Sequence, residues 1–267
     1  MQYSNLHTHT TFSDGKNTPR EMVEKALELG FSSFGFSDHS EFLFDRDFKP
    51  ASGKDLPYRK EIGEIIKEYE AKLDILCGIE RDYFTKDDVS SYEYVIGSVH
   101  YIRFQGEIIP LDWSRKIQED FIQNGGRGEK NELAKRYYEL IAEFAQEGSF
   151  EILGHFDLIN KFGLFDDEDE LYRKIALEAL DEVLKKDIFI EINTGAISRG
   201  YRKDPYPDAF FLKYIQEKGG KIVLNGDSHD ADSISTHFDE SVELMKKIGF
   251  DSLWQLKKSG WEEITLD

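Results

Sequence analysis

The feature that most constrains the fold is a regular alternation between short apolar runs and longer stretches of helical periodicity. Runs rich in apolar, β-branched or aromatic residues predict seven strands, at 3–6, 33–37, 73–79, 94–99, 151–154, 188–192 and 221–224. Helical patterns lie between most of them or after the last, at 19–29, 59–71, 130–146, 170–185, 209–218 and 240–248. Strands that alternate with helices form parallel βαβ units. Seven such strands favour an α/β fold with a closed or nearly closed barrel.

Local signals support several of these helix boundaries. Thr18 precedes Pro19 and is followed three residues later by Glu21, which is the pattern of a capping box with proline at the first helical position. Gly30 and Gly219 stand where a helix commonly ends in a left-handed residue. The helices at 19–29 and 209–218 are therefore predicted to end at these glycines.

The chain contains no internal repeat and no linker-like change of composition, so we expect residues 1–267 to form a single barrel domain. Barrels of this class commonly reach about 250 residues as one unit. The segment 101–129 interrupts the alternation, and its glycine cluster at 124–128 predicts a mobile loop that could cover a site.

The charge balance limits the class of partner. The chain has 34 basic and 53 acidic side chains, a formal net charge of -19, whereas affinity for nucleic acid depends on Lys and Arg that neutralise phosphates. No apolar run reaches the roughly 20 residues that span a bilayer, and the first residues lack a basic region followed by an apolar stretch. We therefore expect a soluble cytoplasmic protein with neither nucleic acid nor membrane as a partner.

Histidines and carboxylates gather at the carboxyl ends of six of the predicted strands. These residues are His7, His9, His39, Glu80, His100, His155, Asp227 and His229. Because the carboxyl ends of parallel barrel strands meet at one mouth, these side chains are expected to share a pocket. Imidazole and carboxylate are ligands of Zn²⁺, Mn²⁺ and Fe²⁺, so the pattern predicts a metal site.

With Asp14 from the first loop there are nine candidate ligands, too many for one ion, so two or three divalent ions are expected. Glu80 is the best candidate for a bridging ligand, because an apolar strand delivers it among histidines. His237 does not fit the pattern, and we expect a capping or surface role for it. Asp38 and Asp157 adjoin ligand histidines and are expected to orient imidazoles through the second ring nitrogen.

These motifs, taken together, resemble those of the polymerase and histidinol phosphatase (PHP) family. The matching segments are His7-Thr8-His9-Thr10-Thr11-Phe12-Ser13-Asp14-Gly15, Ser37-Asp38-His39, Gly78-Ile79-Glu80, Gly97-Ser98-Val99-His100, Gly154-His155-Phe156-Asp157 and Gly226-Asp227-Ser228-His229. Further segments are similar to those of the monofunctional histidinol-phosphatases, namely Asp157-Leu158-Ile159-Asn160-Lys161-Phe162 and Glu191-Ile192-Asn193-Thr194-Gly195 with the following Arg199.

The resemblance implies a distorted seven-stranded (β/α) barrel with three metal ions of Zn, Mn or Fe. It would place the first ion on His7, His9, Glu80 and Asp227, the second on Glu80, His100 and His155, and the third on His39 and His229. Asp14 stands in for a histidine that some relatives carry in the first loop, and we expect it to complete the third site. Glu80, His39 and His229 are the expected catalytic residues.

The implied activity is hydrolysis of a small phosphate monoester, with L-histidinol phosphate of histidine biosynthesis as the favoured substrate. Arg199 and Lys161 follow predicted strands at the same mouth and are expected to bind the phosphate. Two alternatives remain open. One is a phosphoesterase of the same family that acts on another small phosphorylated metabolite or a nucleotide, and the other is a metal-binding module without catalysis.

Overall fold

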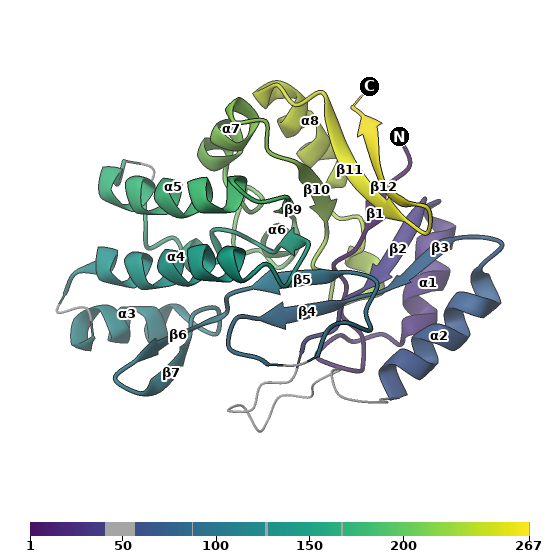
Figure 1. Cartoon of the computed structure of the whole chain (residues 1–267), viewed down its shortest axis with the longest axis horizontal. Helices are drawn as coiled ribbons and strands as arrows, with labels where there is room; N and C mark the ends of the chain where they lie inside the picture. The colour runs from purple at the N-terminus through teal and green to yellow at the C-terminus, as the bar shows by residue number, and fades with distance from the viewer. Residues whose placement is uncertain (41–56, 87, 126–127, 167, 267) are drawn as a thin grey trace.

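Two parallel sheets form the centre of the fold (Figure 1). The computed structural model describes the chain except for residues 41–56, 87, 126–127, 167 and 267. The first sheet has the order β1-β2-β3, with strands Ser4–Asn5, Ser33–Phe36 and Asp74–Cys77. The second has the order β10-β9-β8-β5-β4, with strands Ile222–Asn225, Phe189–Asn193, Ile152–Leu153, Val95–Ser98 and Ile79–Asp82. The chain thus has a mixed α/β fold with parallel sheets, as its sequence predicts.

Helices surround the sheets, and each predicted helix is present to within two residues at either end. They are α1 (Pro19–Glu28), α2 (Pro57–Tyr69), α4 (Lys130–Glu147), α5 (Glu170–Leu184), α7 (Ala209–Glu217) and α8 (Phe238–Ile248). The capping box at Thr18 is formed, and Gly30 and Gly219 take positive φ angles after their helices. Among the described helices, none combines the length and apolar character needed to cross a membrane.

The predicted strand at 73–79 is divided at Gly78 into two strands that belong to different sheets. β3 pairs with β2, whereas β4 pairs with β5. The ring of Tyr94 lies where a side chain at Gly78 would begin, since an added Cβ would overlap its Cζ atom. The Tyr94 hydroxyl lies 2.5 Å from the carbonyl oxygen of Leu6 and 3.0 Å from that of Phe36. Tyr94 therefore ties β1 and β2 to the second sheet at the point where the chain changes sheets.

Isolated parallel bridges connect the two sheets on both sides. Thr8, after β1, pairs with Ser228, after β10, and His39, after β2, pairs with Glu80 in β4. The amide of Leu6 also donates to Oδ1 of Asn225 over 2.8 Å. Between the sheets lies a cluster of buried side chains from both of them and from the carboxyl-terminal part of the chain. The members from the sheets and their ends are Leu6, Leu76, Tyr94, Ile96, Ile152, Phe189 and Val223, and the eighth is Leu256.

A carboxyl-terminal hairpin closes this cluster at the end where the strands begin. β11 (Ser252–Lys257) and β12 (Gly260–Thr265) pair antiparallel and lie beside the first residues of the chain (Figure 1). Leu256 enters the cluster, and the ring of Trp261 stacks on Phe189 with centroids 3.8 Å apart. This hairpin was not predicted from the sequence, and it leaves the opposite end of the strands open for a site.

The segment 101–129, in which the glycine cluster at 124–128 predicts a mobile loop, has regular secondary structure over most of its length. It forms a hairpin of β6 (Tyr101–Phe104) and β7 (Glu107–Pro110), followed by α3 (Arg115–Asn124). Ile102, Leu111 and Phe121 are buried in the main core, which explains why the segment is structured. Gly126 and Arg127 of its glycine cluster lie outside the described residues. For brevity we call residues 101–129 the insertion.

Candidate metal centre

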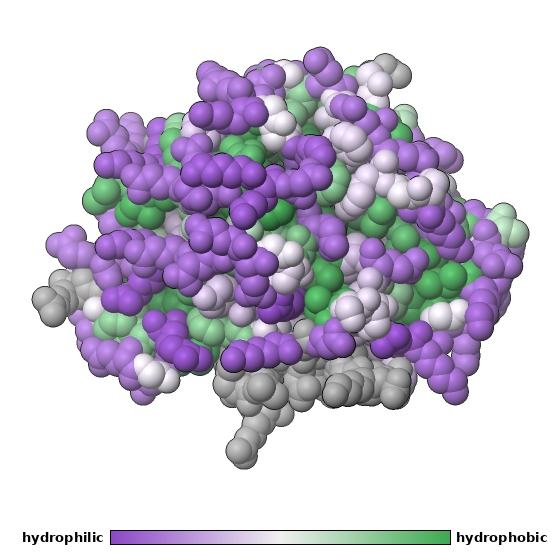
Figure 2. Space-filling model, viewed as in Figure 1, coloured by the Kyte–Doolittle hydropathy of each residue, from purple (hydrophilic) through white to green (hydrophobic). Residues whose placement is uncertain are grey.

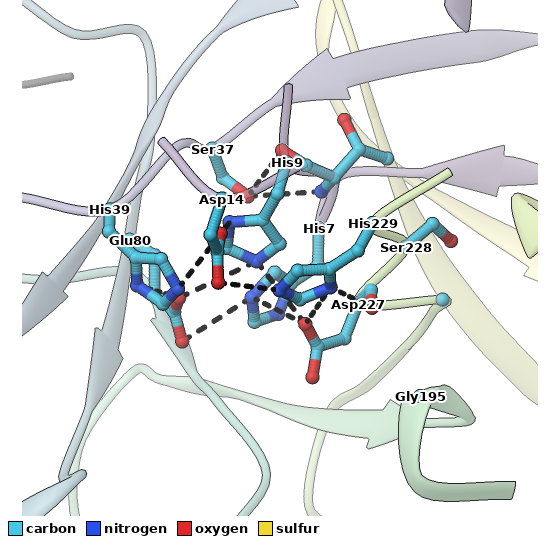
Figure 3. A network of polar contacts seen from close by, with 12 residues as sticks. His7, His9, Asp14, Ser37, His39, Glu80, Gly195, Asp227, Ser228 and His229 are labelled. Atoms are coloured by element: carbon cyan, nitrogen blue, oxygen red, sulfur yellow. Dashed lines mark hydrogen bonds and ion pairs between the residues drawn. The ribbon is translucent and has the colours of Figure 1, made fainter. Parts of the chain in front are cut away.

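The structure brings all nine predicted ligands together at the carboxyl ends of the strands. His7 and His9 follow β1, Asp14 lies between β1 and α1, and His39 follows β2. Glu80 lies in β4, His100 follows β5, His155 follows β8, and Asp227 and His229 follow β10. We call these nine residues the ligand cluster. Figure 3 shows the rings of His7, His9, His39 and His229 turned toward one another around Glu80 and Asp227. Most of the nine line one cavity of about 240 Å³, which we call the central cavity.

Glu80 is the common neighbour within this group. Its side chain is 1% exposed, and both of its carboxylate oxygens face imidazole nitrogens. The closest ring nitrogens of five histidines lie 2.8 to 3.6 Å from it, those of His39 (2.8 Å), His155 (3.0 Å), His7 (3.3 Å), His100 (3.4 Å) and His9 (3.6 Å). This arrangement is the one expected of a carboxylate that bridges two ions.

Asp227 and Asp14 occupy the two remaining sides. Oδ1 of Asp227 lies 3.2 Å from Nε2 of His9 and 3.7 Å from Nε2 of His7. Asp14 has oxygens 3.2 Å from Nε2 of His229 and 3.6 Å from Nε2 of His39. Asp14 therefore lies where the third predicted site requires a ligand, and its side chain is 43% exposed at the mouth.

The donor atoms fit metal ions better than they fit one another. Three groups have ligand atoms that all lie within 4.8 Å of each other: His9 with Asp14, His39 and His229; His7 with His9 and Glu80; and His39 with Glu80 and His100. In the described part of the chain, Nε2 of His7, both ring nitrogens of His9 and Oε2 of Glu80 are buried without a hydrogen-bond partner. Buried polar atoms rarely lack partners, and a divalent ion would satisfy these.

Charges within the cluster shift its ionisation. Burial opposes ionisation of Glu80, but His7, His39 and His100 outweigh it and hold the pKa of this carboxyl well below its usual range. Burial likewise opposes ionisation of Asp227, but Arg199 and His7 lower its pKa. Burial and the neighbouring His229 and His39 lower the pKa of His9 to about 3. Ionised carboxylates and a neutral imidazole are the forms that bind a metal.

Two carboxylates that were not assigned from the sequence contact predicted ligand imidazoles at Nδ1. Oε1 of Glu191, in β9, lies 2.6 Å from Nδ1 of His7, and Oδ2 of Asp82, in β4, lies 3.3 Å from Nδ1 of His100. Such contacts fix the tautomer and leave Nε2 for a metal. For Glu191 the available signal was a lone carboxylate with apolar neighbours on both sides in Phe189–Asn193. Asp82 shares β4 with Glu80 and gave no such signal.

Asp38 and Asp157 were expected to orient imidazoles, but the structure gives them other partners. Asp38 accepts hydrogen bonds from the amide of Thr10 at 2.7 Å and from its hydroxyl at 2.8 Å, so it shapes the first loop. Asp157 pairs with Arg202 at 2.8 Å. His237 stands before α8 with a positive φ angle and lies 3.6 Å from Glu240, in agreement with its predicted surface role.

Arg199 and Lys161, the predicted phosphate ligands, both line the central cavity. The guanidinium of Arg199 donates to Oδ2 and to the backbone oxygen of Asp227, each at 3.0 Å, and its Nη1 lies 3.0 Å from Nδ1 of His229. The ammonium of Lys161 donates to the backbone oxygen of Asp112 at 2.8 Å. Both cations are therefore held against the wall of the cavity, beside the ligand cluster.

Known proteins with similar sequences or folds indicate the family of this chain. A family model described as PHP domain matches residues 5–195. The chain is 29% identical over 257 residues to a protein of Deinococcus radiodurans named probable histidinol-phosphatase, across 91% of this chain and 92% of that one. It is 26% identical to the histidinol-phosphatase of Bacillus subtilis, across 91% and 99%. The structure of histidinol phosphate phosphatase from Lactococcus lactis, complexed with zinc, L-histidinol and phosphate, matches with a TM-score of 0.76 at 24% identity, across 98% of this chain and 99% of that one.

Proposed function

Because the chain belongs to the PHP family, we propose that it is a metal-dependent phosphate monoester hydrolase and that its substrate is L-histidinol phosphate. The observation that carries the chemistry is the Glu80 carboxylate, which lies within 3.6 Å of five imidazoles in a cavity open to solvent. The names of relatives that match over about nine-tenths of the chain support the choice of substrate.

The ligand cluster would hold two to three divalent ions of Zn, Mn or Fe. We assign His7, His9, Glu80 and Asp227 to the first, Glu80, His100 and His155 to the second, and His39, His229 and Asp14 to the third. Such ions, when bound, lower the pKa of water so that it can attack phosphorus, and they neutralise the phosphoryl oxygens.

The chain's own residues orient the substrate and direct charge. Glu191 and Asp82 fix the rings of His7 and His100, so that Nε2 of each faces Glu80. The side chains of His39 and His229 are 11% and 23% exposed, which places them on the solvent side of the cluster where the leaving alcohol would depart. Arg199 and Lys161 would meet the non-bridging oxygens, and the Arg fork suits two of them.

We also propose that residues 1–267 form one distorted seven-stranded barrel. The bridges at Thr8 and His39 join the two sheets where each would close the ring. The buried cluster between the sheets contains side chains from strands of both sheets, as expected of a barrel interior. In this interpretation β3 and β4 are the two halves of one bent strand, which preserves the count of seven.

The alternative is a PHP enzyme for another small phosphate ester, and a direct assay separates the two. Purified protein would be treated with a chelator, reloaded with Zn²⁺ or Mn²⁺, and tested against a panel of phosphorylated metabolites that includes L-histidinol phosphate and nucleotides. We expect metal-dependent phosphate release with the highest kcat/KM on L-histidinol phosphate. A higher kcat/KM on another ester would replace the substrate, and the absence of hydrolysis with every ester would refute the proposed activity.

A further inference from the structure

The wall of the central cavity beyond the ligand cluster is formed by five residues, of which only Arg199 and Lys161 have been assigned a role, at the phosphate. They are Asp112, Leu158, Lys161, Arg199 and Tyr201. Three of the four carboxylates among the described lining residues, Asp14, Glu80 and Asp227, contact the ligand imidazoles. Asp112 is the fourth, and it comes from the insertion, between β7 and α3.

Asp112 has room to accept another cation. Its side chain is 26% exposed, and its Oδ2 atom is 3.7 Å from the ammonium of Lys161, which hydrogen-bonds to the backbone oxygen instead. A carboxylate offers about four lone-pair sites, and among the residues that the structure describes this long ion pair leaves most of the acceptor capacity of Asp112 unused.

Tyr201 stands on the other side of Lys161. Its ring lies 4.8 Å from the Lys161 ammonium and meets the edge of Phe162 at 5.8 Å between centroids. The side chain is unusually exposed for a large aromatic residue, with 52% of Tyr201 accessible at the edge of the cavity. Lys161 and Phe162 thus contact part of the ring, while its exposed surface remains available to a flat ligand.

On the basis of the proposed function, we infer that Asp112 binds the ammonium group of the substrate and that Tyr201 packs against its imidazole ring. L-histidinol phosphate is anionic at one end and cationic at the other, so a cavity with metal ions and Arg199 at one end requires a carboxylate at the other. Asp112 supplies that charge, and Tyr201 supplies an aromatic surface for a planar ring. In this view the insertion exists to bring a specificity residue to the cavity.

The test compares substrates that differ by one group. 3-(Imidazol-4-yl)propyl phosphate lacks the ammonium and O-phosphoethanolamine lacks the imidazole. For Asp112→Asn, the ratio of kcat/KM on histidinol phosphate to that on imidazolylpropyl phosphate should fall by about 10- to 100-fold, the size expected when a charged partner is removed. For Tyr201→Leu, the ratio of kcat/KM on histidinol phosphate to that on phosphoethanolamine should fall by about 3- to 10-fold.

Two further variants make the result specific. Asp120→Asn alters an exposed carboxylate on α3 within the same insertion and should leave both ratios unchanged. Asp112→Glu keeps the charge and should retain more of the ammonium preference than Asp112→Asn does. Equal losses on all substrates in Asp112→Asn would overturn the inference, because Asp112 would then act only through Lys161. A wild-type enzyme that hydrolyses these esters without preferring the ammonium would overturn it too, and one that hydrolyses none would refute the proposed function itself.

Discussion

The carboxylate of Glu191 lies 2.6 Å from Nδ1 of His7, although 184 residues separate the two in sequence. The same carboxylate accepts three further hydrogen bonds, from the side chains of Asn225 at 2.9 Å and Asn193 at 2.8 Å and from the amide of His155 at 2.8 Å. Glu191 is fully buried and therefore fastens the ends of β1, β8, β9 and β10 to one another behind the ligand cluster.

Replacing Glu191 with Gln should weaken metal binding. Both carboxylate oxygens accept from donors, and an amide has only one oxygen, so its NH₂ group must face a donor in either orientation. We expect zinc affinity to fall by about 10- to 100-fold, the usual effect of losing a partner that orients a ligand histidine. Competition titration against a chromophoric chelator would measure this change. Glu178→Gln, on the exposed face of α5, is the control, and equal affinities in the two variants would contradict the role given to Glu191.

Glu80→Gln should cost both metal content and turnover, because Gln keeps the size of the side chain but removes the negative charge between neighbouring cations. We expect kcat to fall by about 10² or more, with elemental analysis showing fewer than two ions per chain. Glu64→Gln, an exposed position on α2, should match the wild type in both measurements. Near-normal turnover in Glu80→Gln would show that the ion pair lies elsewhere.

Arg199→Ala should lose about 2–4 kcal/mol of transition-state stabilisation, measured as kcat/KM on L-histidinol phosphate, because one aimed charged donor is removed. Arg199→Lys keeps the charge without the fork and should lose less. Metal analysis of both variants separates two roles for this residue. Retention of every ion supports phosphate binding, whereas loss of an ion would assign Arg199 to holding Asp227, which it contacts at 3.0 Å.

Asp208, which caps the start of α7, gives the protein a pH-dependent stability. Burial and the charge of Asp157 raise the pKa of Asp208 from 3.8 to about 6. The folded state therefore binds this proton more tightly than the unfolded state, so ionisation costs stability above pH 6 and the cost disappears as the pH falls from 6 to about 4. Asn caps helices as well as Asp does, so Asp208→Asn should be more stable than the wild type by about 1–3 kcal/mol at pH 7.5, and equally stable at pH 4.

Asp169→Asn should change the free energy of unfolding in the opposite direction to Asp208→Asn. Asp169 also caps a helix, α5, but burial of this carboxyl is outweighed by Lys130, 2.8 Å away, and its pKa is lowered. Asparagine should therefore reduce stability at pH 7.5 and matter less in acid. Urea denaturation of both variants at pH 7.5 and pH 4 would show the two signs, and the same sign in both would contradict the opposite pKa shifts of the two caps.

Gly78→Ala should destabilise the fold, because its new methyl group would overlap the buried ring of Tyr94. We expect a loss of about 2–3 kcal/mol in the free energy of unfolding, as for other overpacked core sites. Gly63→Ala is the matched control, since nothing lies within 4 Å of an added Cβ at this position in α2. That variant should be neutral or gain about 0.5–1 kcal/mol. Equal urea midpoints for the two variants would contradict the close contact between Gly78 and the Tyr94 ring.

The predictable parts of the structure are those in which local sequence and tertiary environment agree. Parallel strands project their last residues toward one edge, so His7, His39, His100 and Asp227 could be placed together without knowledge of any contact. The need for glycine at position 78 could not be predicted in this way. It depends on the ring of Tyr94, which comes from a different part of the chain. The hairpin at 252–265 was missed because Trp254 and Trp261 are only partly buried. The role of Glu191 was missed because three of its four partners belong to distant parts of the chain, at the ends of β1, β8 and β10.

The surface does not reveal this organisation. Figure 2 shows hydrophilic side chains over most of the visible face, with hydrophobic atoms appearing only in patches between them. This is consistent with a formal charge of -19, and it would make the positive charge of any bound ions important for attracting an anionic ester into the central cavity.

The position of β1 also has a consequence for folding kinetics. This strand is two residues long, and the amide of Leu6, just after it, donates to Asn225, 219 residues away. Contacts of such sequence separation form slowly, because a long stretch of chain must be ordered before they are made. We therefore expect β1 to reach its final position only after β10 has formed. His7 and His9, which follow β1, would be positioned at that late step.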